Sequence, residues 1–468
     1  MWGIGFSAAA TSAIAAAMPF HRHDIAGEAR RLLALAWPVI LTSLNWTALQ
    51  LIDVAFVGHA GTEELSALAA ARTLTFVVIV AGLGAVSGVL VFTARDDGAG
   101  HVAGTADRWR GGILAALLLG LAGMAVLMLT GLPAMQALGV PPAMAGRGAA
   151  VVDAMAIGFP GLLIMASTGY FLEGISRPAR VTAVNLLTLP ANAVLAWSLV
   201  GGHGGFAAHG AVGGAMATSL VNLGGAGLLL LSVWLLPDAR ARGVRDIGVT
   251  AWRRAAGDLP GLLRFGVVPA FAAGFELAGF SWLIALSTRL GAVTAAAYQT
   301  VFSLHNLLFG IALGFASAAG VRVGNALGAQ ERGQALPRTM IAVALAVAVM
   351  GAGGGLMALF PDRAVAPFSG DPAVLRMAAS MLAMLGPFML FDGVQLICLY
   401  ALRSMGDQIA GGANSILAYF IVTGGSGWYL VTNGWTGTGL IIATAAGMVA
   451  AAALQGGRLV WISSRLVR

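Results

Sequence analysis

The chain has 468 residues, of which 59% are hydrophobic and 10% are charged, and its mean hydropathy is +0.87. Apolar runs of about 20 residues, long enough to cross a bilayer, recur along it, which excludes a soluble protein and predicts a polytopic α-helical membrane protein. The net charge of +7 is the difference between 26 Arg, with no Lys, and 19 Asp and Glu; it reflects membrane topology and does not indicate nucleic-acid binding.

The first 32 residues are predicted to form a cytoplasmic segment. Residues 1–17 are rich in Ala and contain no basic residue, unlike the start of a signal peptide. Met18 is therefore the expected native start, and a short disordered tail is the alternative.

Gly, Pro and charge clusters divide residues 33–462 into twelve candidate membrane-spanning helices, so the predicted fold is an all-α membrane protein. The longest polar stretch, residues 237–260, is rich in Arg and is predicted to be a cytoplasmic linker between two six-helix lobes, residues 33–236 and 261–462. A cytoplasmic tail, residues 463–468, is expected after the last helix. The predicted helices are residues 33–57, 65–93, 111–131, 147–171, 181–201, 211–236, 262–288, 294–321, 338–360, 374–402, 411–432 and 437–462.

The Arg distribution predicts the orientation of these helices. With both termini in the cytoplasm, about 21 Arg fall on the cytoplasmic side and about 5 near the outer side, as the positive-inside rule requires. We therefore expect a multi-pass protein of a cytoplasmic membrane, with both termini in the cytoplasm.

The two halves resemble each other at a constant shift of about 230 residues. Gly61 and Gly291 precede the second and eighth helices, and Gly98 and Gly328 follow those helices in matching charged elbows. With an even number of helices in each half, this pattern predicts two pseudo-symmetric lobes related by an axis along the membrane normal, with a substrate path between them.

Three carboxylates stand out within predicted helices: Asp53 in the first, Glu276 in the seventh and Asp392 in the tenth. An ionisable side chain at this depth costs at least about 2.5 kcal/mol on insertion scales, so it usually faces a water-filled cavity. Two acids in one low-dielectric cavity cannot both ionise easily, so Glu276 and Asp392 are expected to share a proton or hold a cation. Asp53 either acts in the same way or only pairs with Arg72, which lies at a similar depth.

Other polar residues within the predicted helices have weaker interpretations. Gln299 and Gln395 lie on the helices that flank the acidic pair, and they either line a cavity or bond between helices. His305 is interpreted as a packed, hydrogen-bonded histidine, and no His partner is expected for the central acids. The chain has no Walker motif, Rossmann fingerprint or nucleophile elbow, which argues against an ATPase or another enzyme.

Several segments resemble the multidrug and toxic compound extrusion (MATE) family, and its NorM-like branch most closely. They are Ile52–Gly61 (IDVAFVGHAG), Val321–Glu331 (VRVGNALGAQE) and Phe391–Gln395 (FDGVQ), together with Phe275 and Glu276. The resemblance implies a secondary active antiporter for multidrug efflux, which exports organic, often cationic, xenobiotics by alternating access in exchange for H+ or Na+. The resemblance implies no cofactor apart from the coupling ion. A monomer suffices for this architecture.

The resemblance also implies functional positions. In NorM-like members, acids on the seventh and tenth helices form a cation site; they match Glu276 and Asp392, which would be metal ligands only with Na+ as the coupling ion. An acid on the first helix and an Asn on the fifth match Asp53 and Asn192. A Tyr hydroxyl commonly precedes the tenth-helix acid by one turn, where this chain has Phe388, and the missing oxygen favours H+ slightly over Na+.

The alternative function is that of a lipid-linked sugar or polysaccharide flippase of the same superfamily. Such relatives commonly have more than twelve helices and a basic cavity, whereas this chain has central acids. The expected partners are therefore small organic cations or drugs, together with the lipid bilayer. The sequence leaves the identity of the substrate open.

Overall fold

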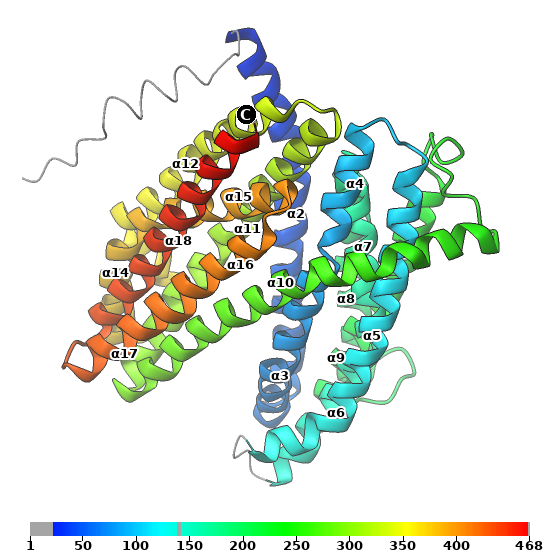
Figure 1. Cartoon of the computed structure of the whole chain (residues 1–468). Helices are drawn as coiled ribbons and strands as arrows, with labels where there is room; N and C mark the ends of the chain where they lie inside the picture. Colours follow the sequence, from blue (N-terminus) through cyan, green and yellow to red (C-terminus); the bar gives the residue numbers. More distant parts are fainter. Residues whose placement is uncertain (1–21, 138–141, 467–468) are drawn as a thin grey trace, which may run out of the picture.

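The structure, a computed structural model, describes residues 22–137 and 142–466 of the chain. Every regular element in these two ranges is a helix, and they contain no β-strand (Figure 1). The all-α architecture predicted from composition is confirmed. Residues 1–17, which were expected to precede the native start, lie outside the described residues.

The first lobe contains six spans, two of which are broken. Ser87 separates α3 from α4, and α6 and α7 meet at an angle of 40°. Glycine ends the fifth span, because Gly202 adopts the left-handed conformation (φ 73°) that closes the last turn of α8. The helices are α2 (Arg22–Ala60), α3 (Thr62–Val86), α4 (Gly88–Gly98), α5 (Gly104–Ala137), α6 (Pro142–Ile157), α7 (Phe159–Gly174), α8 (Pro178–Gly201) and α9 (Gly210–Trp234).

The second lobe also contains six spans. A short 3-10 turn, η3 (Gly386–Phe388), interrupts one span, and a π-helical segment, η4 (Ile416–Thr423), forms the middle of another. Such π segments often occur at functional sites. The longer helices are α10 (Val249–Arg289), α11 (Ala292–Gly328), α12 (Ala335–Leu359), α14 (Pro372–Leu385), α15 (Met389–Met405), α16 (Gln408–Ser415), α17 (Gly424–Thr432) and α18 (Gly437–Leu466).

Eleven helical segments in the described ranges are long and apolar enough to span a membrane, and the bent pair α6–α7 makes a twelfth. The prediction of twelve helices in two lobes is thus confirmed, but the helices are longer than predicted. α2 begins at Arg22, α10 begins at Val249 inside the expected linker, and α18 continues to Leu466. Hydropathy detects only the part of a helix that lies in hydrocarbon, whereas its backbone hydrogen bonds continue beyond that layer.

The two lobes converge at one end of the molecule and diverge toward the other, where α6 and α17 lie (Figure 1). We name the convergent end, where α2 begins and α18 ends, the closed end. There α4 crosses α11 at the matching elbow glycines: a Cβ on Gly98 would lie 2.3 Å from the carbonyl oxygen of Asn325, and one on Gly328 would lie 2.0 Å from that of Arg95. Only glycine permits this approach.

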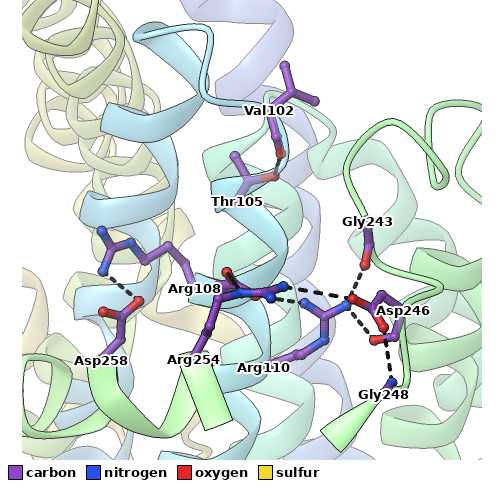
Figure 2. Close-up of polar contacts among 10 residues, drawn as sticks. Val102, Thr105, Arg108, Arg110, Gly243, Asp246, Gly248, Arg254 and Asp258 are labelled. Atoms are coloured by element: carbon purple, nitrogen blue, oxygen red, sulfur yellow. Dashed lines mark hydrogen bonds and ion pairs between the residues drawn. The ribbon is translucent and has the colours of Figure 1, made fainter. Parts of the chain in front are cut away.

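Ion pairs and hydrogen bonds fix the segment between the lobes to the first lobe (Figure 2). Arg108 of α5 pairs with Asp258 of α10 at 3.0 Å, and the buried Arg110 donates to the backbone oxygen of Asp246 at 2.7 Å. Arg254 lies 3.7 Å from the Asp246 carboxylate. The first turns of α10 therefore pack on the first lobe.

The closest approach between α10 and α3 lies at Gly266, where a Cβ would be 1.8 Å from the carbonyl oxygen of Ala85. We expect Gly266→Ala to force these helices apart and to lower the free energy of unfolding by about 1–3 kcal/mol. Thermal unfolding in detergent would measure this loss. Gly257→Ala is the matched control, because a Cβ there meets no atom within 4 Å and Ala favours helix. Equal losses in the two variants would contradict the prediction.

Candidate functional site

Asp392 on α15 is held by three side chains from three helical elements. The Nε2 atom of His305 on α11 lies 3.0 Å from Oδ2, and the Tyr419 hydroxyl on η4 donates to Oδ1 at 2.8 Å. Gln395, one turn further along α15, donates to Oδ1 at 3.2 Å. Asp392 is only 1% exposed, so these groups replace the water that would otherwise solvate the carboxylate.

His305 contacts Asp392 from within an aromatic cage. The rings of Phe280, Phe302 and Phe309 lie 6.0, 6.0 and 6.2 Å from the imidazole, centroid to centroid. The Nδ1 atom is buried and has no hydrogen-bond partner in the part of the chain that the structure describes. Nε2 is therefore the nitrogen that carries a hydrogen toward Asp392, in the neutral ring and in the imidazolium alike.

Glu276 on α10 is half-buried and lies four residues before Phe280, on the same helix face. The Phe280 ring packs 5.4 Å from the Tyr419 ring as well as against His305, so this face of α10 borders the Asp392 group. No set of three His, Cys, Asp or Glu side chains in the described ranges is arranged to hold a metal ion.

Asp53 on α2 forms the centre of a second polar group, in the first lobe. Arg72 on α3 pairs with it at 3.0 Å, Asn192 on α8 donates to it at 2.8 Å, and Thr218 on α9 donates at 2.9 Å. Asp53 is 5% exposed. Two expected neighbours, Arg72 and Asn192, thus meet at one carboxylate, which joins four helices of the first lobe.

Two other predicted site residues make no such contact. The Gln299 side chain is exposed on α11, and Phe388 is 38% exposed at the end of η3, where its ring lies 6.3 Å from Phe391. Position 388 is Phe and offers no hydroxyl to Asp392. Tyr419, on another helical segment, donates a hydroxyl hydrogen bond to Asp392 instead.

Sequence reasoning missed the residues that complete the Asp392 group. The expectation that the central acids have no His partner is wrong, since His305 lies against Asp392 although 87 positions separate them. Tyr419 escaped notice because it occurs in a plain apolar run. The available signal was the intramembrane position of His305 itself, since a ring with two polar nitrogens requires a partner when it is buried.

Comparisons with known proteins agree with this architecture. The family model described as MatE matches residues 38–198 and 271–424, more than half of the chain. A probable multidrug resistance protein NorM of Caulobacter vibrioides is 31% identical over 418 residues, which cover 87% of this chain and 86% of that protein. The multidrug resistance protein NorM of Vibrio cholerae is 25% identical over 449 residues, covering 95% and 97%.

Solved structures share the fold. The eukaryotic MATE transporter AtDTX14 has a TM-score of 0.85 at 21% identity, covering 93% of this chain and 96% of that one. An outward-facing multidrug resistance MATE family transporter of the MOP superfamily has a TM-score of 0.83 at 19% identity, covering 94% and 97%. Together, the family match and the NorM relatives show that the chain belongs to the MATE family, as a NorM-like multidrug transporter and not an enzyme.

Proposed function

We propose that this transporter is an H+-coupled antiporter, which exports organic, often cationic, compounds by alternating access. The observation that carries the proposal is the contact between His305 and Asp392, at 3.0 Å, in the second lobe. An imidazole against a carboxylate offers a nitrogen and two oxygens that can hold a proton between them. Glu276, on the neighbouring face of α10, would then sense the change of charge.

The bonding of Asp392 favours H+ over Na+. Both carboxylate oxygens already accept hydrogen bonds, two of them from nitrogen atoms, whereas hard cations prefer several oxygen ligands. Binding of Na+ by Glu276 and Asp392 would have to displace these donors. Binding of a proton at His305 and Asp392 needs no such displacement, so we favour a proton site there over a metal site formed by Glu276 and Asp392.

Such a site can drive exchange without covalent chemistry. A proton shifts the conformational equilibrium only if it binds the two conformations with different affinity. When a proton binds at His305 and Asp392, the net negative charge of this group is neutralised. A bound organic cation then loses an attractive interaction, and its release becomes easier. The proton and the exported cation therefore compete, which links the two fluxes.

We further propose an orientation for the molecule. The Arg-rich elbows and linker lie at the closed end, and the positive-inside rule places that end in the cytoplasm together with both termini. The structure would then correspond to an outward-open state. In the opposite state the lobes, residues 33–236 and 261–462, would part on the cytoplasmic side, with residues 237–260 linking them in a monomer.

Efflux from proteoliposomes tests the coupling ion. We expect an imposed ΔpH to drive export of an organic dye cation such as ethidium, and an imposed Na+ gradient to have little effect. Asp392→Asn should lower the ΔpH-driven rate by about 100-fold, because the proton site loses its charge. Asp362→Asn, an exposed acid of the same lobe, is the matched control and should keep the wild-type rate.

Efflux driven by Na+ alone would overturn the choice of ion. A ΔpH-driven rate that survives Asp392→Asn would move coupling away from the second lobe. If neither gradient drives efflux of any tested cation from reconstituted, folded protein, then the antiport proposal fails as a whole.

A further inference from the structure

The last turns of α18, at the closed end of the molecule, carry two arginines over one tryptophan ring (Figure 1). The guanidinium carbon of Arg458 lies 4.2 Å from the centroid of the Trp461 ring, and that of Arg465 lies 3.8 Å from it. The two guanidinium carbons are therefore at most 8.0 Å apart, the sum of these two distances. We name these three residues, which share one face of the helix, the Trp461 cluster.

Only one of the two positive charges is balanced within the described part of the protein. Arg458 forms a bidentate pair with Asp407, the residue before α16, with its Nε and Nη2 atoms at 2.5 and 3.1 Å from the carboxylate oxygens. Arg465 is exposed, and among residues 22–137 and 142–466 it has neither a carboxylate partner nor a hydrogen bond to a terminal carbonyl of α18. Together with Asp407, the cluster has a net charge of one positive unit and lacks one anion.

The cluster lies where lipid headgroups are expected. Trp461 is 41% exposed and the adjacent Val460 is 55% exposed, at the end of a helix long and apolar enough to span a membrane. Trp side chains concentrate at the level of the headgroups, and Arg side chains at that level attract anionic lipids. A Cβ built on Gly457, one turn before Trp461, would meet no atom within 4 Å, so the described protein leaves this side of the cluster open.

The repeat in the first lobe supports this depth. α9 begins at Gly210 and α18 at Gly437, and the same difference of 227 positions separates Trp234 from Trp461. The matching Trp is also 39% exposed, and the guanidinium of Arg245 lies 5.8 Å from its ring. Both lobes thus place an exposed Trp with an Arg beside it at the same end of their last helix, as expected of two contacts with one membrane surface.

The charges at the two matching positions differ. Where the second lobe has Arg458 and Arg465, the same shift gives Leu231 and Asp238 in the first lobe. The single arginine beside Trp234 donates from both Nε and Nη2 to the backbone oxygen of that residue, at 3.1 Å each. The first lobe therefore offers an acid where the second offers a free guanidinium, and it serves as an internal control.

We propose that the Trp461 cluster binds the headgroup phosphate of an anionic phospholipid. Arg465 presents its guanidinium fork to the phosphate oxygens, and Arg458 contributes the Nη1 group that Asp407 leaves free. The acyl chains lie along the open side of α18, over Gly457. With the orientation proposed above, this lipid belongs to the cytoplasmic leaflet. The inference goes beyond the proposed antiport, because binding of the lipid requires neither a coupling ion nor alternating access.

Fluorine NMR of the full-length protein, labelled with 5-fluorotryptophan in a non-ionic detergent, tests the proposal. Substitution of Trp461 or Trp234 by Phe identifies the resonance of each. We expect phosphatidylglycerol to shift the Trp461 resonance to saturation and to leave that of Trp234 in place. Phosphatidylcholine with the same acyl chains should bind about fivefold more weakly or worse, because its headgroup has no net negative charge. Inorganic phosphate, which has no acyl chain, should cause no shift at the same concentrations.

Arg465→Gln should weaken the binding of phosphatidylglycerol by about fivefold, the contribution of one basic residue near an anionic headgroup. Because this side chain has no polar partner in the described protein, thermal unfolding without lipid should match wild type. Arg332→Gln is the matched control: it removes an exposed arginine from another segment of the closed end, and binding should stay within about twofold of wild type.

A Trp461 resonance that phosphatidylglycerol does not shift overturns the proposal, and so do equal affinities for the two lipids. A shift caused by inorganic phosphate would replace the lipid site by a site for small anions. Equal losses in Arg465→Gln and Arg332→Gln would reduce the effect to the general charge of this surface. None of these results involves transport, so each would leave the proposed antiport as it stands.

Discussion

In a His305→Gln variant, export driven by ΔpH is expected to fall by about 100-fold while the protein remains folded. The Gln amide can still donate a hydrogen bond to Asp392, but it cannot bind a proton. The Asp392 carboxylate thus keeps a hydrogen-bond partner, and the change removes mainly the imidazole that is proposed to bind the proton. Initial rates of ethidium efflux from proteoliposomes at a fixed ΔpH, with thermal unfolding of the same samples, would measure the two effects separately.

Tyr419→Phe is the control for this prediction, because it removes a different donor from Asp392 and leaves the pair with His305 in place. Loss of one hydrogen bond should reduce the rate by about tenfold at most. A His305→Gln rate within about threefold of wild type would contradict proton transfer through the imidazole. A loss of equal size in both variants would mean that the position of the carboxylate, and not the proton on His305, limits transport.

The helices and the buried acids could be predicted because both depend on local sequence. A run of about 20 apolar residues has few alternatives to a membrane helix, and a carboxylate inside such a run is conspicuous. Asp53 and Asp392 accordingly lie at the centres of the two polar groups in the structure. The salt bridge between Asp53 and Arg72 could also be predicted from the sequence, since both residues lie at a similar depth on consecutive helices.

The partners of Asp392 could not be predicted in the same way. Whether His305 faces α15 or another neighbour depends on the rotation of α11 about its axis, which the packing of several helices fixes together. Tyr419 reaches Asp392 from a π-helical segment, whose altered turn changes the direction of each side chain relative to an α-helix. No hydropathy pattern encodes that change. The hydrogen bond that Ser317 of the second lobe donates to Glu173 of the first lobe could not be predicted from the sequence either, because the relative placement of the two lobes determines it.

The two acidic groups differ in how their charge is balanced. Asp53 faces a permanent cation, since an Arg guanidinium remains protonated in proteins, whereas Asp392 faces an imidazole that can gain or lose its charge. A permanent ion pair holds helices together, whereas a histidine–carboxylate pair can in principle bind an additional proton. We therefore propose that coupling occurs in the second lobe and that Asp53 has a structural role.

Asp53→Asn is expected to lower the free energy of unfolding by about 3 kcal/mol, since it leaves the guanidinium of Arg72 without its partner in a largely buried site. The Arg72 side chain is 21% exposed and that of Asp53 is 7% exposed, so water replaces the lost interaction poorly. Thermal or denaturant unfolding in detergent would measure the loss. Asp53→Asn should also lower efflux, because less of the protein is folded.

The double variant Asp53→Asn/Arg72→Gln separates structure from coupling. With both charges removed, the two amides can still bond to each other, and we expect most of the lost stability to return, because no buried charge is left unpaired. If Asp53 only anchors α2 to its neighbours, ΔpH-driven efflux by the double variant should return to within about threefold of wild type. Recovery of stability without recovery of transport would show instead that the negative charge of Asp53 is itself used in the transport cycle.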